Sequence, residues 1–144
     1  MEKRITLELL QAARAYRVRA AKLLGRVGLY PGQDSLLKLL HDRGQMTMGE
    51  AANALSIQPP TVTKMVNRLS VAGLVKTEVV DQDRRKINVA MTDAGKAKIS
   101  EIDTIWHDLE VEALDKVEPQ SMLRSQLSAI IRNLSRSDTK APAI

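Results

Sequence analysis

A stretch near the middle of the chain most narrowly limits the fold, because it carries the signals of two short helices separated by a tight break. Thr47 and Glu50 have the spacing of a capping box, in which the hydroxyl accepts from the Glu50 backbone N–H and the carboxylate reaches back. Residues 56–58 then interrupt the apolar period. Pro59 and Pro60 suit the first turn of a helix, where backbone N–H groups lack partners. The pattern therefore predicts two helices joined by a tight turn.

The second predicted helix has one apolar side and one polar, basic side. Its helical period places inward Val62, Met65, Val66 and Leu69. The same period places outward Thr61, Thr63, Lys64, Asn67 and Arg68. This arrangement is typical of a helix-turn-helix, whose second helix can lie in the major groove of DNA. The alternative is that these polar residues form only a solvated helix face.

After Gly73 the apolar period changes from that of a helix to that of a strand. Residues 74–80 are rich in β-branched side chains, and apolar and smaller or polar side chains alternate over residues 87–91. A charged segment, 81–86, separates the two runs. We expect a β-hairpin, which is called a wing when it follows such a helix. The alternative is a charged turn that only keeps an exposed sheet edge soluble.

Long amphipathic segments flank this core. Residues 5–27 have one apolar face, Gly28 is a predicted stop and Pro31 a predicted new start, with a further helix over 32–42. Thr92 is the predicted cap of a helix that continues to Val117, Pro119 interrupts the period, and a last helix carries Leu123, Leu127, Ile130, Ile131 and Leu134. The first and last helices carry more apolar surface than a small core can cover. A second copy of the chain would bury it; packing within one chain is the alternative.

Composition excludes several classes of function. The net charge is +5, concentrated in residues 1–30 and 61–98, which suits an anionic partner but is also compatible with simple solubility. Cysteine is absent, so disulfides, thiolate zinc sites and thiol redox sensing are excluded. With no long apolar run and no apolar core of a signal peptide, we expect a cytoplasmic protein without a membrane span.

The sequence offers little to an enzyme or a metal site. The two histidines, His41 and His107, are far apart, and no glycine-rich phosphate loop accompanies them. Convergence of the histidines with Asp108, Glu110 and Glu112 is the remaining metal-binding alternative. We expect no catalysis, no bound metal and no required cofactor.

Three motifs occur in order with consistent gaps. The first is Thr47, Glu50, Ala52 and Leu55; the second is Pro60-Thr61-Val62-Thr63-Lys64 with Val66, Arg68-Leu69 and Gly73-Leu74-Val75; the third is Asp83, Arg85, Met91-Thr92 and Gly95. Together they resemble the winged helix-turn-helix core of the MarR family of bacterial transcriptional regulators. Met91 replaces the usual leucine of that pattern, a change that conserves volume. Gln58 replaces the usual Ser or Asp cap of the second helix.

The resemblance implies a mainly α fold with a small β-hairpin wing. A winged helix-turn-helix core at 31–98 would lie between an N-terminal dimerisation helix at 1–30 and C-terminal dimerisation helices at 99–135, followed by a flexible tail at 136–144. It also implies a homodimer that binds a pseudo-palindromic double-stranded operator, often as a repressor under the control of a small molecule. The alternative is a winged-helix module that binds another protein and no DNA.

The candidate DNA-binding residues follow from the helix and the wing. They are Gln58, Pro60, Thr61, Thr63, Lys64, Asn67 and Arg68 in the helix, and Asp83, Arg84, Arg85 and Lys86 in the wing. Threonine hydroxyls suit phosphates or bases, Lys64 and Arg68 suit guanine or phosphates, and Asn67 can pair bidentately with adenine.

In the wing, an arginine can enter a narrow minor groove. We assign that role to Arg85, a backbone contact to Arg84 and a phosphate contact to Lys86, with the two arginines interchangeable. The family resemblance gives Asp83 the role of a brace for the tip.

The resemblance also implies an effector pocket between the dimerisation helices and the DNA-binding lobe. Its candidate lining residues are Tyr16, Tyr30, His41, Met46 and Trp106, although packing in the core explains each of them as well. The identity of the effector does not follow from the sequence.

Overall fold

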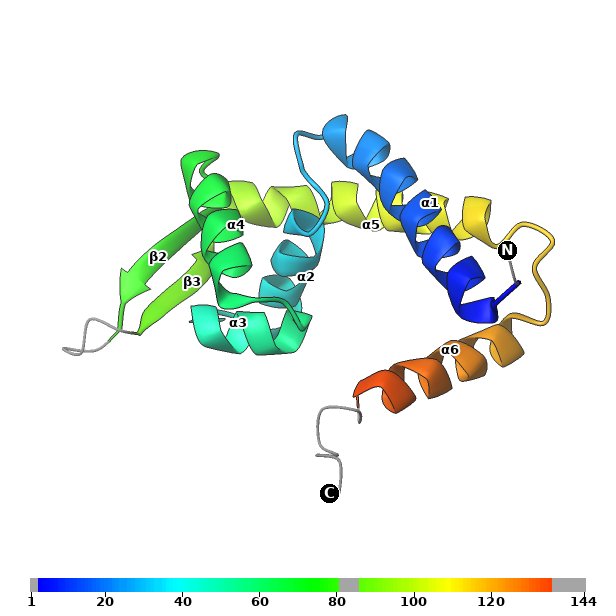
Figure 1. The fold of residues 1–144 in the computed structure, drawn as a ribbon. Coiled ribbons are helices and arrows are strands. Elements are labelled where there is room, and N and C mark those ends of the chain that lie inside the picture. The colour runs from blue at the N-terminus through cyan, green and yellow to red at the C-terminus, as the bar shows by residue number, and fades with distance from the viewer. Residues whose placement is uncertain (1–2, 81–85, 136–144) are drawn as a thin grey trace, which may run out of the picture. The chain divides into compact units, whose positions relative to one another are not determined.

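The computed structural model describes residues 3–80 and 86–135. The chain has two compact units, 1–109 and 110–144. In chain order the elements are α1 (Ile5–Gly25), α2 (Gln33–Arg43), β1 (Met46–Thr47), α3 (Met48–Leu55), α4 (Pro59–Val71), β2 (Val75–Val79), β3 (Ile87–Met91), α5 (Asp93–Ala113) and α6 (Gln120–Ser135) (Figure 1). The expectation of a mainly α fold with a small hairpin is confirmed. The predicted tail, 136–144, lies outside the described residues.

The connection between α1 and α2 ends later in the chain than predicted. Gly28, the predicted stop of α1, adopts a left-handed conformation with φ of 76°. The next helix begins at Gln33 rather than at Pro31. Two side chains of its first turn explain the shift: Gln33 Oε1 accepts from the Tyr30 N–H and Asp34 Oδ1 from the Gly32 N–H, both at 2.9 Å. These bonds extend the turn by two residues before the helix starts.

The core of the first unit is formed by the C-terminal half of α1, by α2, α3, α4 and α5, and by the sheet. Its fully buried side chains include Leu36, Leu37, Val62, Val66, Leu69, Val89 and Ile102. Full burial of each such side chain contributes roughly 1.5–3 kcal/mol before entropy is counted. All the apolar residues predicted to face inward on α4 are buried or half-buried. The core therefore fixes which side of α4 stays in solvent.

Both predicted helix starts around the tight turn are confirmed. Thr47 Oγ1 accepts from the Glu50 N–H at 3.1 Å, and Glu50 Oε2 accepts from the Thr47 N–H at 3.3 Å, so the capping box at α3 is complete. Ser56 ends α3 in a left-handed conformation with φ of 53°. Gln58 is the N-cap of α4 and makes no capping bond with its side chain, while Pro59 and Pro60 occupy the first turn.

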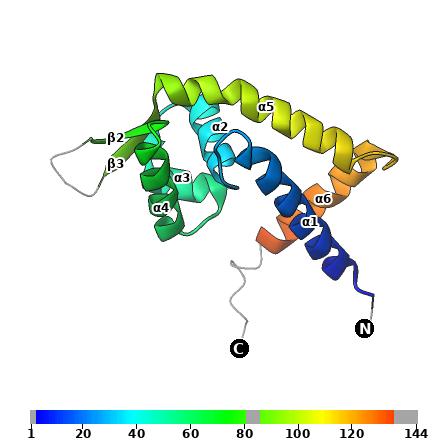
Figure 2. The same ribbon diagram turned by 90° about the horizontal axis from the view of Figure 1, so that it is seen from above.

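The sheet has three antiparallel strands in the order β1-β3-β2. The β2–β3 hairpin is as predicted, with Val75 opposite Met91 and Val79 opposite Ile87. It projects away from α2, α3 and α4 in both views (Figures 1 and 2). The sequence did not predict β1, in which Met46 pairs with Val89, because two residues are too few to show a period of two.

The predicted cap at Thr92 is also confirmed. Its Oγ1 accepts from the Gly95 N–H at 3.1 Å and donates to the Gly73 carbonyl at 2.6 Å, so one hydroxyl starts α5 and ties it to the end of α4. The second unit contains α6, on which no residue is buried. Within the described ranges, no helix is both long and apolar enough to span a membrane.

Candidate nucleic-acid interface

The outer face of α4 carries a stripe of three candidate residues. Pro60, Lys64 and Asn67 follow one another at steps of four and three, which places them on one side of the helix. All three are exposed, and Val71, which continues the stripe, is 92% exposed. We call Pro60, Lys64 and Asn67 the outer stripe. The outer stripe presents the ammonium group of Lys64 and the amide group of Asn67 to solvent.

A second stripe on α4 faces the connection between α1 and α2. It consists of Thr61, Met65 and Arg68, again at steps of four and three. Thr61 and Met65 line a cavity, and the Arg68 guanidinium carbon lies 5.7 Å from the centroid of the Tyr30 ring. That distance is within the range of a cation–π contact. Arg68 therefore lies on the flank of the helix and contacts its own chain.

The remaining candidates on α4 have partly committed polar groups. The Thr63 hydroxyl donates to the Pro59 carbonyl at 3.1 Å, which leaves its oxygen as an acceptor. Gln58 is exposed and lines the same cavity as Thr61. The structure therefore places Gln58 and Thr61 at the cavity side of the helix start rather than in the outer stripe.

In the wing, the base of the hairpin is described and its tip is not. The Val80 N–H donates to the Lys86 carbonyl at 3.2 Å, and Lys86 is exposed. Asp83, Arg84 and Arg85, the predicted tip residues, lie outside the described residues. Their proposed roles stay predictions from the sequence.

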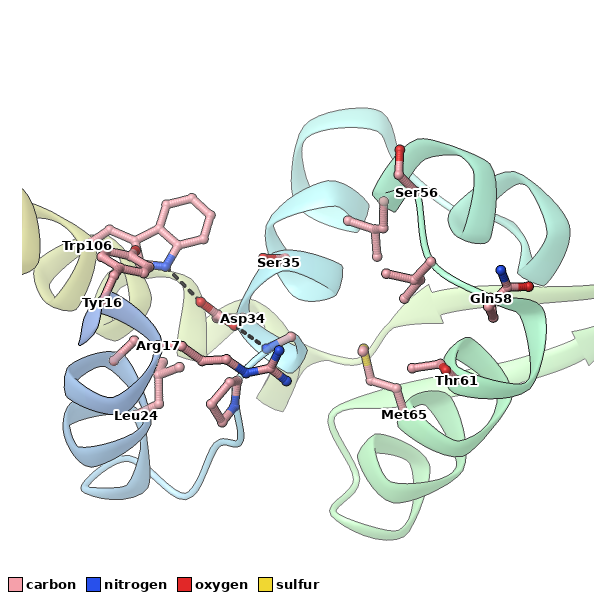
Figure 3. Close-up of a pocket in the computed structure, with 15 residues that line it drawn as sticks. Tyr16, Arg17, Leu24, Asp34, Ser35, Ser56, Gln58, Thr61, Met65 and Trp106 are labelled. Carbon is pink, nitrogen blue, oxygen red and sulfur yellow. Dashed lines mark hydrogen bonds between the residues drawn. The ribbon is translucent and has the colours of Figure 1, made fainter. Parts of the chain in front are cut away.

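A cavity of about 700 Å³ lies between α1, α2, the start of α4 and α5 (Figure 3). Tyr16 and Trp106 line it, as expected, and Arg17 extends into it from α1. Asp34 is on its wall and accepts from the Trp106 indole N–H at 2.9 Å. The volume is within the range of sites for small organic molecules.

Three residues expected at this cavity do not line it. Tyr30 contacts Arg68 on the other side of the turn, and Met46 is buried on β1, where the strand pairs with β3. His41 is exposed at the end of α2, with its Nδ1 3.1 Å from Asp42. The sequence gives the period of a helix but not which helix covers which face, so it could not separate these three residues from those that line the cavity.

A charged contact joins α2 to α5 beside the cavity. Lys38 Nζ lies 2.8 Å from Asp103 Oδ1 and 5.8 Å from the centroid of the Trp106 ring. The hydrogen bond that Lys38 donates to the Asp103 carboxylate raises the pKa of Lys38 above its usual value, against a smaller lowering by burial. Lys38 therefore remains charged at any physiological pH.

Two residues that line this cavity, Arg17 and Asp34, were not predicted from the sequence. Asp34 carried a local signal, since an aspartate two residues after Gly32 can accept the glycine N–H in the first turn of a helix. Arg17 carried none, because a basic residue on a long amphipathic helix normally faces solvent. Among the residues that the structure describes, no group of three or more His, Asp or Glu side chains could hold a metal ion.

Comparison with known proteins agrees with this geometry. The sequence model of the MarR family matches residues 29–87, which run from the α1–α2 connection to the first residue of β3. The uncharacterised HTH-type transcriptional regulator YwoH of Bacillus subtilis is 34% identical over 104 residues, covering 72% of this chain and 75% of that protein. The HTH-type transcriptional repressor MdtR of the same organism is 26% identical over 114 residues, covering 78% and 74%.

A solved structure extends the likeness to the whole fold. A cysteine-to-serine variant of MarR from E. coli, crystallised with operator DNA, has a TM-score of 0.79 at 19% identity and covers 88% of this chain and 92% of that chain. The two proteins therefore share a fold over most of their length. The family match and the relative at 34% identity show that this chain belongs to the MarR family of transcriptional regulators.

Proposed function

We propose that the chain acts as a homodimer that binds a pseudo-palindromic double-stranded operator in a sequence-specific manner and represses transcription. The observation that carries the proposal is the outer stripe of α4, exposed beside an antiparallel hairpin. A major groove is wide enough for one α-helix, and the first turns of that helix reach the base edges. Lys64 and Asn67 are side chains of the types that contact phosphate, guanine and adenine.

The names of similar proteins support the same proposal. MdtR is named as a repressor, and the E. coli MarR variant was crystallised with operator DNA. The basic excess of residues 61–98, which include α4 and the wing, supplies the charge that a DNA backbone requires.

A second copy of the chain would cover the apolar surface of the terminal helices. In the first unit, α1 leaves Ile5, Leu10 and Val18 exposed. In the second, α6 leaves Met122, Leu127, Ile131 and Leu134 exposed. Surfaces of this kind support a two-fold dimer, which would present two copies of α4 to half-sites about 34–36 Å apart.

The test starts from a pool of random-sequence duplexes, from which repeated binding to the full chain selects a preferred sequence. In the wild type, we expect affinity for the selected duplex to fall log-linearly as salt rises. The substitutions Arg85→Ala and Asn67→Ala should each cost roughly 1–3 kcal/mol of binding free energy for that duplex. Lys64→Ala should weaken binding to all duplexes if the lysine contacts phosphate, or reduce discrimination if it contacts guanine.

The exposed Lys22 of α1 offers a matched control, since Lys22→Ala removes the same charge outside the interface. If Arg85→Ala and Lys64→Ala together leave affinity for the selected duplex unchanged, the recognition model is wrong. A flat response to salt would favour the alternative, a winged helix that binds another protein.

The cavity between α1, α2, α4 and α5 supports a role for a small-molecule effector. Its aromatic walls, Tyr16 and Trp106, and the guanidinium of Arg17 combine apolar area with a polar group that can orient a ligand. Trp106 is the only tryptophan in the chain, so its fluorescence reports on this cavity directly. In a screen of small organic molecules, compounds that quench Trp106 should release the selected duplex; quenching without release would contradict the proposed control.

A further inference from the structure

Asp34 is a buried carboxylate that joins two separate parts of the fold. Among the residues that the structure describes, the buried polar ones are Gln33 and Asp34, and Asp34 is 8% exposed. Its Oδ2 accepts from the Trp106 indole N–H on α5, and its Oδ1 accepts from the Gly32 backbone N–H, both at 2.9 Å (Figure 3). Burial of a carboxylate is costly unless such donors compensate it. The pair of bonds fixes the turn before α2 against α5.

The same turn, Tyr30–Gly32, also packs against α4. A Cβ placed on Gly32 would lie 2.9 Å from the Met65 Cε, so the methyl group of Met65 packs directly on the glycine. Two residues earlier in the turn, the Tyr30 ring lies under the Arg68 guanidinium. The turn therefore contacts α4 at two points, one helical turn apart, and both belong to the second stripe of α4, which consists of Thr61, Met65 and Arg68.

We infer that Asp34 is a positioning residue for DNA recognition: through the Tyr30–Gly32 turn it sets the orientation of α4, although it lies outside the DNA-binding face. This inference rests on the proposed function. Moving the turn would shift Met65 and Arg68, and with them the outer stripe on the same rigid helix. Base contacts depend on orientation, whereas contacts to the uniform phosphate backbone tolerate it.

The substitution Asp34→Asn tests this role while it hardly changes the shape of the side chain. A carboxylate has two acceptor oxygens for two N–H donors, but an asparagine has one acceptor and one donor group. Asp34→Asn therefore loses one of the two bonds in either orientation of the amide, and sets a donor against a donor. Trp106→Phe removes the indole N–H while it keeps an aromatic ring, so it releases the same carboxylate from the other side.

The measurement is the affinity for the selected duplex divided by that for a scrambled duplex of equal length and composition. Partial unfolding would lower both affinities by the same factor and leave the ratio unchanged. A misplaced α4 lowers only the affinity for the selected duplex. For both Asp34→Asn and Trp106→Phe we expect the ratio to fall about tenfold, with the double variant little worse than either alone.

The matched control is Asp103→Asn, which makes the same chemical change in the ion pair with Lys38, also between α2 and α5 but without contact to the turn. It should leave the ratio within about twofold of the wild type. If Asp34→Asn and Trp106→Phe also stay within that limit, or Asp103→Asn lowers the ratio equally, the inference is wrong. Should Asp34→Asn fail to fold, Trp106→Phe decides the question alone.

The same experiment separates this inference from the function on which it rests. If the wild type enriches no duplex from the pool, the proposed function fails and the inference falls with it. If the wild type selects a duplex and the variants discriminate equally well, only the positioning role of Asp34 is refuted.

Discussion

At the scale of single residues, the tightest surroundings of any glycine in the described chain are those of Gly95, the third residue after the Thr92 cap of α5. A Cβ there would overlap the backbone carbonyl oxygen of Leu74, which cannot move without disturbing the start of the hairpin. We expect Gly95→Ala to lower the free energy of unfolding by about 3 kcal/mol, as overpacking against backbone does. At Gly25, an added Cβ would meet no atom within 4 Å beyond its own stretch of helix, so this position supplies the control.

Urea denaturation of the two variants measures the difference. Gly25→Ala should stay within about 1 kcal/mol of the wild type, since alanine is the better helix former. Equal losses at Gly25 and Gly95 would contradict the steric argument.

The helix caps that the sequence predicted correctly have partners that are near in the chain. Thr47 and Thr92 each cap a helix by accepting from an N–H three residues on, so a spacing rule finds them. Asp34 and Trp106 are 72 positions apart, and no local pattern relates them. For the same reason, the outward face of α4 was predicted as one group, whereas the structure divides it into an outer stripe and a flank.

At the scale of elements, the start of α3 tests how much a local signal contributes to the fold. Thr47→Ala removes the acceptor for the Glu50 N–H and should cost about 1 kcal/mol of stability. Thr104 on α5 is a suitable control because its hydroxyl only donates back to the Ser100 carbonyl in mid-helix. Thr104→Ala should change the free energy of unfolding by less than about 0.5 kcal/mol. A loss at Thr47 no larger than that at Thr104 would show that the capping box contributes nothing.

Most elements were predictable because the period of the apolar residues and the residues that start or end helices indicate the same boundaries. The change from a helical period to alternation after Gly73 gave the hairpin, and Pro59 with Pro60 gave the start of α4. The two-residue β1 and the delayed start of α2 escaped prediction. Both depend on contacts that a local window does not contain: pairing of β1 with β3, and the side-chain bonds of Gln33 and Asp34.

At the scale of the whole molecule, the proposed recognition of two half-sites requires assembly from two copies. Paired substitutions Leu127→Glu and Ile131→Glu place charges on the apolar face of α6, where Ile131 is 64% exposed in the single chain. We expect them to dissociate the dimer and to reduce operator affinity at least about tenfold, since one half-site then binds alone. Sedimentation equilibrium gives the mass of the assembly.

Ser125, exposed on the opposite side of α6, provides a control in which an added glutamate lies away from the apolar face. Ser125→Glu should leave the dimer intact. A monomeric wild type, or a dimer that survives both glutamates, would contradict the proposed role of the terminal helices.

Recognition of DNA by two copies of α4 is tested by hydroxyl-radical and methylation protection of the selected duplex with the full chain. We expect two protected regions related by a two-fold axis, centred in successive major grooves about one helical turn apart, each weakened by Asn67→Ala. No protection, or a single region that Asn67→Ala leaves unchanged, would contradict recognition of DNA by paired copies of α4.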